Sequence, residues 1–136
     1  MKNTTYLFLA VLLICAGCPD QDKFDPDREI RIVNSSAIDL VELRTVLLQN
    51  DTLLPISSPF TDQNFIESAT IVSGLKISIP VESETISEYG LMLYLFSRDT
   101  IEQVSWERIV DEYLVLRRYD LTLEDLEAMD WTVEYK

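Results

Sequence analysis

The sequence predicts a mainly β fold: a single antiparallel, sandwich-like domain with a minor helical part of two short helices near the C-terminus. Two observations predict the strands. Short segments alternate apolar and polar side chains, which is the period of a half-buried strand. Turn-forming residues separate them, and few links are long enough for the crossover helices that parallel strands need. A third observation, two helix-start signals in the last third of the chain, predicts the helices.

The first two predicted strands open the domain. In residues 28–33, isoleucines alternate with charged side chains, so the isoleucines share one face. In residues 39–49 the alternation continues, with Glu42 on the face opposite Val41. Residues 52–68 contain two prolines and several Ser and Thr, which predicts long loops.

Four more strands are expected further along the chain. Residues 75–81 alternate cleanly, and Pro80 predicts a sheet edge because proline cannot donate to a strand ladder. Residues 91–96 are continuously apolar, which predicts a central strand buried on both faces. The last two predicted strands are residues 114–119 and 131–135.

The two predicted helices lie beside these last strands. Ser105 is a suitable N-cap for a helix over residues 106–113, where apolar side chains recur at helical spacing. Thr122 begins a capping-box-like sequence, which predicts a second helix over residues 123–129.

Composition excludes several classes of function. The chain has 11 basic and 24 acidic residues, a formal net charge of −13, which argues against nucleic-acid binding because phosphate contacts need Lys and Arg. There is no histidine, and the two cysteines are Cys15 and Cys18. We therefore expect no metal site, no cofactor and no disulfide in the folded domain.

The N-terminus has the pattern of a lipoprotein signal peptide. Lys2 precedes an apolar run over residues 6–14 that is too short to span a bilayer as a helix. The run ends in Cys15-Ala16-Gly17-Cys18, where two small residues precede a cysteine. We expect cleavage between Gly17 and Cys18, with acyl chains such as palmitate on Cys18 anchoring the protein to a membrane. Ordinary secretory cleavage and an uncleaved anchor helix are the alternatives.

This pattern divides the chain into three parts. Residues 1–17 are the predicted signal peptide, residues 18–27 an acidic flexible tether and residues 28–136 the β-rich domain. The aspartates of the tether resemble a calcium loop, but it lacks the glycine and the later glutamate that an EF-hand requires.

Two kinds of residue are candidates for a ligand site. The aromatic side chains Trp106, Tyr119 and Trp131 are candidates for a sugar-stacking surface, although each also falls on an apolar face, where a core aromatic belongs. Paired carboxylates could act as acid and base in glycan hydrolysis, although such pairs also serve as helix caps and solvated charges. These pairs are Glu82/Glu84, Asp111/Glu112 and Glu124/Asp125.

Parts of the chain resemble a family. DTIEQVSWE of residues 99–107, RRYDLTLEDLEAMDWTV of residues 117–133 and IVNSS of residues 32–36 are similar to segments of small uncharacterised lipoproteins of Bacteroidetes-type bacteria. The resemblance implies an outer-membrane lipoprotein held by Cys18, on either face of that membrane, and it implies no catalytic residue. We therefore expect a lipid-anchored, non-catalytic binding or accessory domain that contacts an envelope protein or a glycan. A small glycan-acting hydrolase is the alternative.

Overall fold

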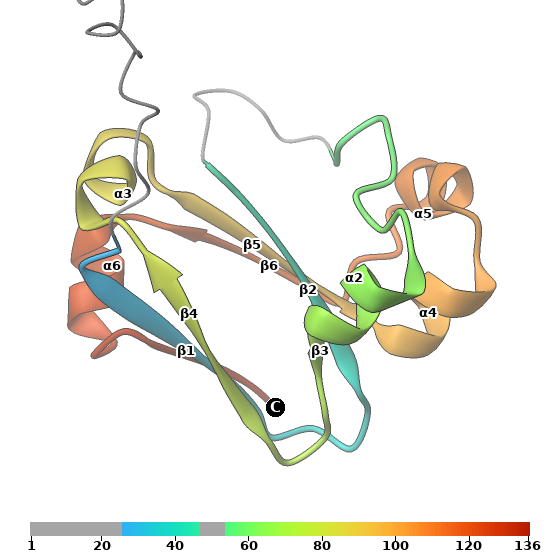
Figure 1. Ribbon diagram of the computed structural model, residues 1–136, viewed down its shortest axis with the longest axis horizontal. Helices are drawn as coiled ribbons and strands as arrows, with labels where there is room; N and C mark the ends of the chain where they lie inside the picture. Colours follow the sequence, from blue (N-terminus) through green and yellow to red (C-terminus); the bar gives the residue numbers. More distant parts are fainter. Residues whose placement is uncertain (1–25, 47–53) are drawn as a thin grey trace, which may run out of the picture.

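Two β-sheets packed face to face form the frame of the molecule (Figure 1). The structure is a computed structural model that describes residues 26–46 and 54–136. The predicted signal peptide, Cys18 and most of the predicted tether lie outside these residues. Sheet A has the strand order β4-β1-β7, and sheet B has the order β3-β2-β5-β6. The strands are β1 (Arg28–Asn34), β2 (Leu40–Val46), β3 (Thr70–Ile71), β4 (Lys76–Val81), β5 (Leu91–Ser97), β6 (Arg117–Leu121) and β7 (Thr132–Tyr135).

Five short helices are described, in two groups. Helices α2, α4 and α5 lie on the side of sheet B that faces away from sheet A, whereas α3 and α6 lie together at one end of the sheets (Figure 1). The helices are α2 (Gln63–Ser68), α3 (Ser83–Tyr89), α4 (Arg98–Gln103), α5 (Trp106–Glu112) and α6 (Leu123–Ala128).

Strand β5 supplies both main hydrophobic cores. Its odd-numbered leucines point into the space between the sheets, where Ile30 and Ile32 of β1 meet them. Its even-numbered side chains, including Tyr94 and Phe96, point the other way and pack beneath α5 against Ile109. Every side chain from position 91 to position 96 is buried. The prediction of a central strand buried on both faces is therefore confirmed.

The predicted fold class is also confirmed, with one correction in the strand pairing. The described domain is mainly β, and β4, which holds Pro80, is an edge strand as expected. Strands β1 and β7, however, pair in parallel, with Ile32 opposite Val133. These strands lie near opposite ends of the domain, so the intervening chain serves as the crossover that a parallel pair requires. The antiparallel prediction rested on short links between strands that follow each other in the chain, and such links say nothing about how the first and the last strand pair.

The two predicted helices are present as α5 and α6, but the number of helices was underestimated. Helices α2, α3 and α4 were not predicted, and α2 occupies part of the segment 52–68 that was expected to be loop. Each has only six or seven residues, and at most one of its side chains is buried, which is too little to establish a helical period.

The strand predicted over residues 114–119 begins later, at Arg117. Tyr113 ends α5 in the left-handed conformation, with φ of 51°. Leu114 then donates its backbone N–H to the Ile109 carbonyl and packs with Val115 into the core beneath α5. These apolar residues therefore belong to the helix end and not to the strand.

A buried asparagine fastens the two turns at the far end of the sheets. Asn34 is fully buried, and its Nδ2 donates to the carbonyls of Ile38 (2.8 Å) and Ile71 (2.9 Å). Its Oδ1 accepts from the backbone N–H and the hydroxyl of Ser36. One side chain thus joins the β1–β2 turn to the end of β3, and every polar atom of it has a partner.

We expect Asn34→Ala to lower the free energy of unfolding by about 3 kcal/mol, because it leaves buried backbone carbonyls without donors. Urea denaturation of the variant and of the natural protein measures the difference. Ser35→Ala, which removes only an exposed bond to Glu134, is the control and should change stability by less than ~0.5 kcal/mol. Equal stability of the Asn34→Ala variant and the natural protein would contradict this role.

Candidate functional site

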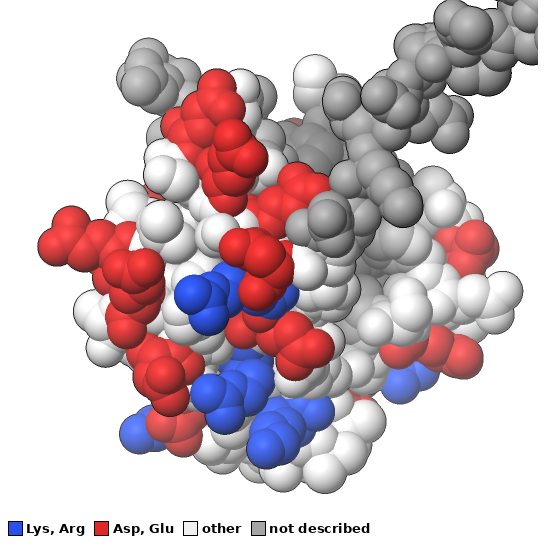
Figure 2. Space-filling view, turned by 60° about the vertical axis from the view of Figure 1, so that its left-hand side comes forward, with Lys and Arg blue, Asp and Glu red and all other residues white. Residues whose placement is uncertain are grey.

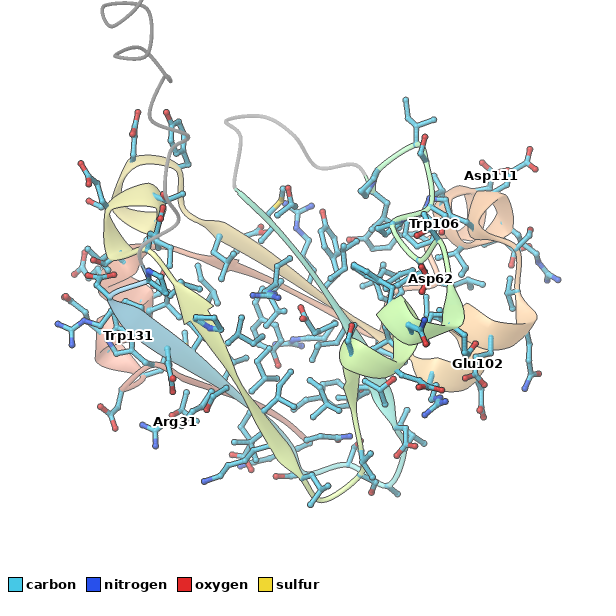
Figure 3. The ribbon with its side chains drawn as sticks, viewed as in Figure 1. Arg31, Asp62, Glu102, Trp106, Asp111 and Trp131 are labelled. Atoms are coloured by element: carbon cyan, nitrogen blue, oxygen red, sulfur yellow. The ribbon has the colours of Figure 1, made fainter. Side chains whose placement is uncertain are left out.

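A wide depression surrounds Trp131 on the outer face of sheet A. It has a volume of about 600 Å³ and opens widely to solvent. Figure 3 shows Arg31 and Trp131 on this side of the molecule. Residues 26–29, Arg31, Pro80, Asp130 and Trp131 line it. None of the five described helices covers this face of the sheet (Figure 1), and Glu29 and Arg31 of β1 are exposed on it.

Strained backbone positions Trp131. Helix α6 ends in a Schellman arrangement, in which Trp131 N–H donates to the Leu126 carbonyl (2.8 Å) and Asp130 N–H to the Glu127 carbonyl (3.1 Å). Asp130 has φ of 49° at the place where glycine is usual, and Trp131 follows with φ of 54°. A bulky residue rarely adopts this conformation, which must be stabilised by its surroundings. Arg31 N–H donates to the Trp131 carbonyl (2.8 Å) and so joins the turn to β1.

Charged groups flank the outer side of the indole, whose other side packs against the core between the sheets. The Arg28 guanidinium lies 5.7 Å from the centre of the Trp131 ring, a cation–π distance. Arg31 Nη2 lies 3.5 Å from Asp130 Oδ2, in an exposed ion pair. Figure 2, which brings this side forward, shows basic side chains in the middle of the face with acidic ones around them. The depression therefore combines an aromatic surface with positively charged hydrogen-bond donors and negatively charged acceptors.

Asp27 holds the segment before β1, which lines this depression, to the start of α3. Its carboxylate accepts hydrogen bonds from the backbone N–H (2.8 Å) and the hydroxyl of Ser83 at the start of α3. The Ser83 hydroxyl and the Ser83 backbone N–H lower the pKa of Asp27, because both stabilise the ionised form. Asp27 was assigned to the flexible tether, but these bonds make it part of the folded domain.

The three candidate aromatic residues do not form one surface. Trp106 lies on the opposite side of the molecule from Trp131 (Figure 3). It packs edge-on against Phe60 and Phe96, and its Nε1 donates to the Pro55 carbonyl (2.9 Å). Trp106 is therefore a core residue that ties the segment before α2 to α5.

Tyr119 belongs to a second, smaller depression between the edges of β6 and β7. Its hydroxyl donates to the Glu134 carbonyl (3.2 Å), and the Arg117 guanidinium lies 5.5 Å from its ring centre. Burial raises the pKa of Tyr119, because the phenolate is harder to desolvate than the phenol. Of the three aromatic residues, Trp131 alone lines the large depression.

The predicted carboxylate pairs lie at the ends and on the surface of helices. Asp125 forms a capping box with Thr122, and these hydrogen bonds lower its pKa. Glu112 forms an exposed ion pair with Arg108 (2.7 Å). Glu82 accepts from the Thr85 hydroxyl (3.0 Å) at the start of α3. Their partners Glu84, Asp111 and Glu124 are exposed. None of these six residues lines the depression around Trp131.

Sequence reasoning missed the most unusual carboxylate, Glu42. It was expected on a face opposite Val41, which is correct, but that second face also packs in the interior. Only 6% of Glu42 is exposed, and both of its oxygens accept from Arg44 Nε, at 3.1 and 3.0 Å. Burial raises the pKa of Glu42, and the nearby Arg44 only partly offsets this effect. Alternation cannot reveal such a residue, because it does not show that both faces are covered.

Comparison with known proteins adds no family. The chain matches no protein-family model, none of the curated proteins and none of the solved structures with which it was compared. Its resemblance to small lipoproteins therefore stays a prediction. Within residues 26–46 and 54–136, no helix is both long enough and apolar enough to cross a membrane, and no three acidic or other metal-binding side chains gather around one point.

Burial of Glu42 predicts a pH dependence of stability. Its pKa is higher in the folded protein than in the unfolded chain, where a glutamate titrates near 4.5. The folded state therefore binds a proton more tightly, and stability falls as pH rises from about 4.5 through the raised pKa. Glu42→Gln removes this titration. Urea denaturation between pH 4 and 8 should show the natural protein losing stability relative to this variant as pH rises, whereas a constant difference would refute the assignment.

Proposed function

We propose that this protein is an outer-membrane lipoprotein, anchored through acylated Cys18, whose domain is a non-catalytic module that binds an envelope glycan. The observation that carries the proposal is the depression around Trp131, in which an indole lies among guanidinium and carboxylate groups on an uncovered sheet face. The lipid anchor rests on the N-terminal sequence pattern.

The chemistry of the depression suits a sugar. The C–H face of a pyranose packs on an aromatic ring, here in the place that the Arg28 guanidinium takes over Trp131 without a ligand, and its hydroxyl groups bond to charged side chains. Arg31 and Asp130 are exposed, so their polar atoms are within reach of such a ligand. Packing against the core between the sheets holds the indole in place before a ligand arrives, which reduces the entropy lost on binding.

The position of the depression suits a ligand near a membrane. Its lining begins at Pro26, the first described residue. Eight peptide steps separate Cys18 from Pro26, and a fully extended chain spans at most ~3.6 Å for each step. If Cys18 is anchored, this edge of the depression is held within about 30 Å of the acyl attachment. A surface glycan or peptidoglycan strand at that distance is within reach.

Binding is favoured over hydrolysis by the roles that two of the three lining carboxylates, those of Asp27 and Asp130, already have. Asp27 is bound by Ser83, and Asp130 is paired with Arg31. A glycosidase needs one carboxylic acid that stays protonated near neutral pH. The hydrogen bonds from Ser83 shift Asp27 in the opposite direction.

Tryptophan fluorescence tests the site directly, because the chain has only two tryptophans. Trp106→Phe leaves Trp131 as the sole reporter, and Trp131→Phe leaves Trp106. Titration with soluble peptidoglycan fragments and lipopolysaccharide core oligosaccharides should change the emission of the first variant and not of the second. Trp131→Ala should weaken binding about tenfold, since stacking and apolar burial are both lost. Absence of any response from Trp131, with the fold intact by circular dichroism, would reject a glycan site here.

Cell fractionation tests the anchor. The natural protein should sediment with outer membranes, whereas Cys18→Ala should appear in the soluble fraction because two or more acyl chains are needed for stable attachment. Cys15→Ala is the matched control and should remain in the membrane. Retention of Cys18→Ala in the membrane would contradict lipid anchoring without bearing on the glycan site.

A further inference from the structure

A further cavity, nearly as open to solvent as the depression around Trp131, lies on the opposite edge of sheet A, where β4 and β2 face each other. It has a volume of about 320 Å³, within the range of small-molecule sites. The opening follows from the topology, because β3 pairs only with Leu40 and Val41 and no described strand covers that edge of β2 further on. Helix α3 closes one end of the cavity with Thr85 and Ile86.

The interior of this cavity is largely apolar. Val81, Ile86 and Leu91 line it, and all three belong to the core between the two sheets. A ligand that enters can therefore bury aliphatic surface, at about 25 cal/mol for each Å² removed from water. The cavity does not share the charged surroundings of Trp131, and only Pro80 lines both.

Among the described residues that line this cavity, Arg44 is the positively charged one. Arg44 uses only its Nε to bond Glu42, and 38% of its side chain is exposed, compared with 6% for Glu42. Within the described ranges, its two Nη groups have no hydrogen-bond partner. The buried carboxylate therefore holds the guanidinium through Nε, and among the described residues nothing occupies the Nη groups of this lining side chain. A guanidinium presented in this way suits the two oxygens of a carboxylate.

We propose that this cavity binds an aliphatic carboxylate, with its acid group on Arg44 and its chain on the apolar lining. Glu42 acts as a positioning residue for Arg44 and reduces the net charge that the ligand meets. Glu82, on the rim, adds a negative charge that weakens the attraction. The site is independent of the glycan site, so either one can fail alone.

Two variants that differ only at position 44 give a clean test. Glu42→Gln keeps Arg44 and removes the competing carboxylate, whereas Glu42→Gln combined with Arg44→Met removes the guanidinium without leaving an unpaired buried charge. Both are made in the full chain carrying Cys18→Ala, so that nonspecific uptake by the N-terminal segment is the same. Isothermal titration calorimetry measures the affinity for decanoate and, as the uncharged control, for decan-1-ol.

We expect decanoate to bind the Glu42→Gln variant about tenfold or more tightly than the double variant, since hydrogen bonds to charged groups contribute ~1.5–3 kcal/mol. Decan-1-ol should not distinguish the two variants, and Glu82→Gln should strengthen decanoate binding. Trp131→Ala should leave it unchanged. Equal decanoate affinity of the paired variants, or no binding to either, would overturn the proposal, provided that thermal unfolding shows both to be folded.

Discussion

The two-sided burial of β5 is the constraint on which the rest of the structure depends. A strand whose side chains from position 91 to position 96 are all aliphatic, thioether or aromatic must be covered on both faces. Sheet A covers one face with the side chains of β1 and β4, and helices α4 and α5 cover the other. The molecule is therefore three layers deep, and β5 lies in the middle layer.

This arrangement determines which surface remains open. Among the described elements, sheet B is covered on both sides, whereas sheet A has a layer on one side only. On β1 the outward residues Glu29 and Arg31 are accordingly charged, whereas Ile30 and Ile32 face sheet B. Among the described residues that line the depression on this face, the aromatic one, Trp131, comes from the turn before β7. Because β7 must run parallel to β1 directly after α6, the chain turns sharply there, and Asp130 and Trp131 take left-handed conformations.

The ion pair of Glu42 and Arg44 follows from the same layering. Strand β2 lies beside β5, so one of its faces turns toward sheet A and the other toward the helices. A glutamate on the inner face loses its hydration, and a guanidinium on the same strand restores only part of that loss. Such a pair contributes little to stability compared with apolar residues of similar size. Its value lies in holding Arg44 in one orientation at the cavity.

The sequence by itself determined the local structure of most elements. The alternation in β1 and β4, the continuous apolar run of β5 and the caps Ser105 and Thr122 each depend on neighbouring residues, which a linear pattern records. It also singled out Trp131 as a candidate contact for a ligand. It could not separate Trp131 from Trp106 and Tyr119, because apolar spacing is the same for a core aromatic and for an exposed one.

Only the tertiary structure decided what each face meets. The short helices α2, α3 and α4 make too few buried contacts to leave a period in the sequence, and they are stabilised by the sheets on which they pack. The parallel pairing of β1 with β7, the burial of Glu42 and the depression around Trp131 all join residues far apart in the chain. Burial depends on how the layers assemble. Local alternation therefore predicted on which face of its strand Glu42 lies, but not that this face is buried.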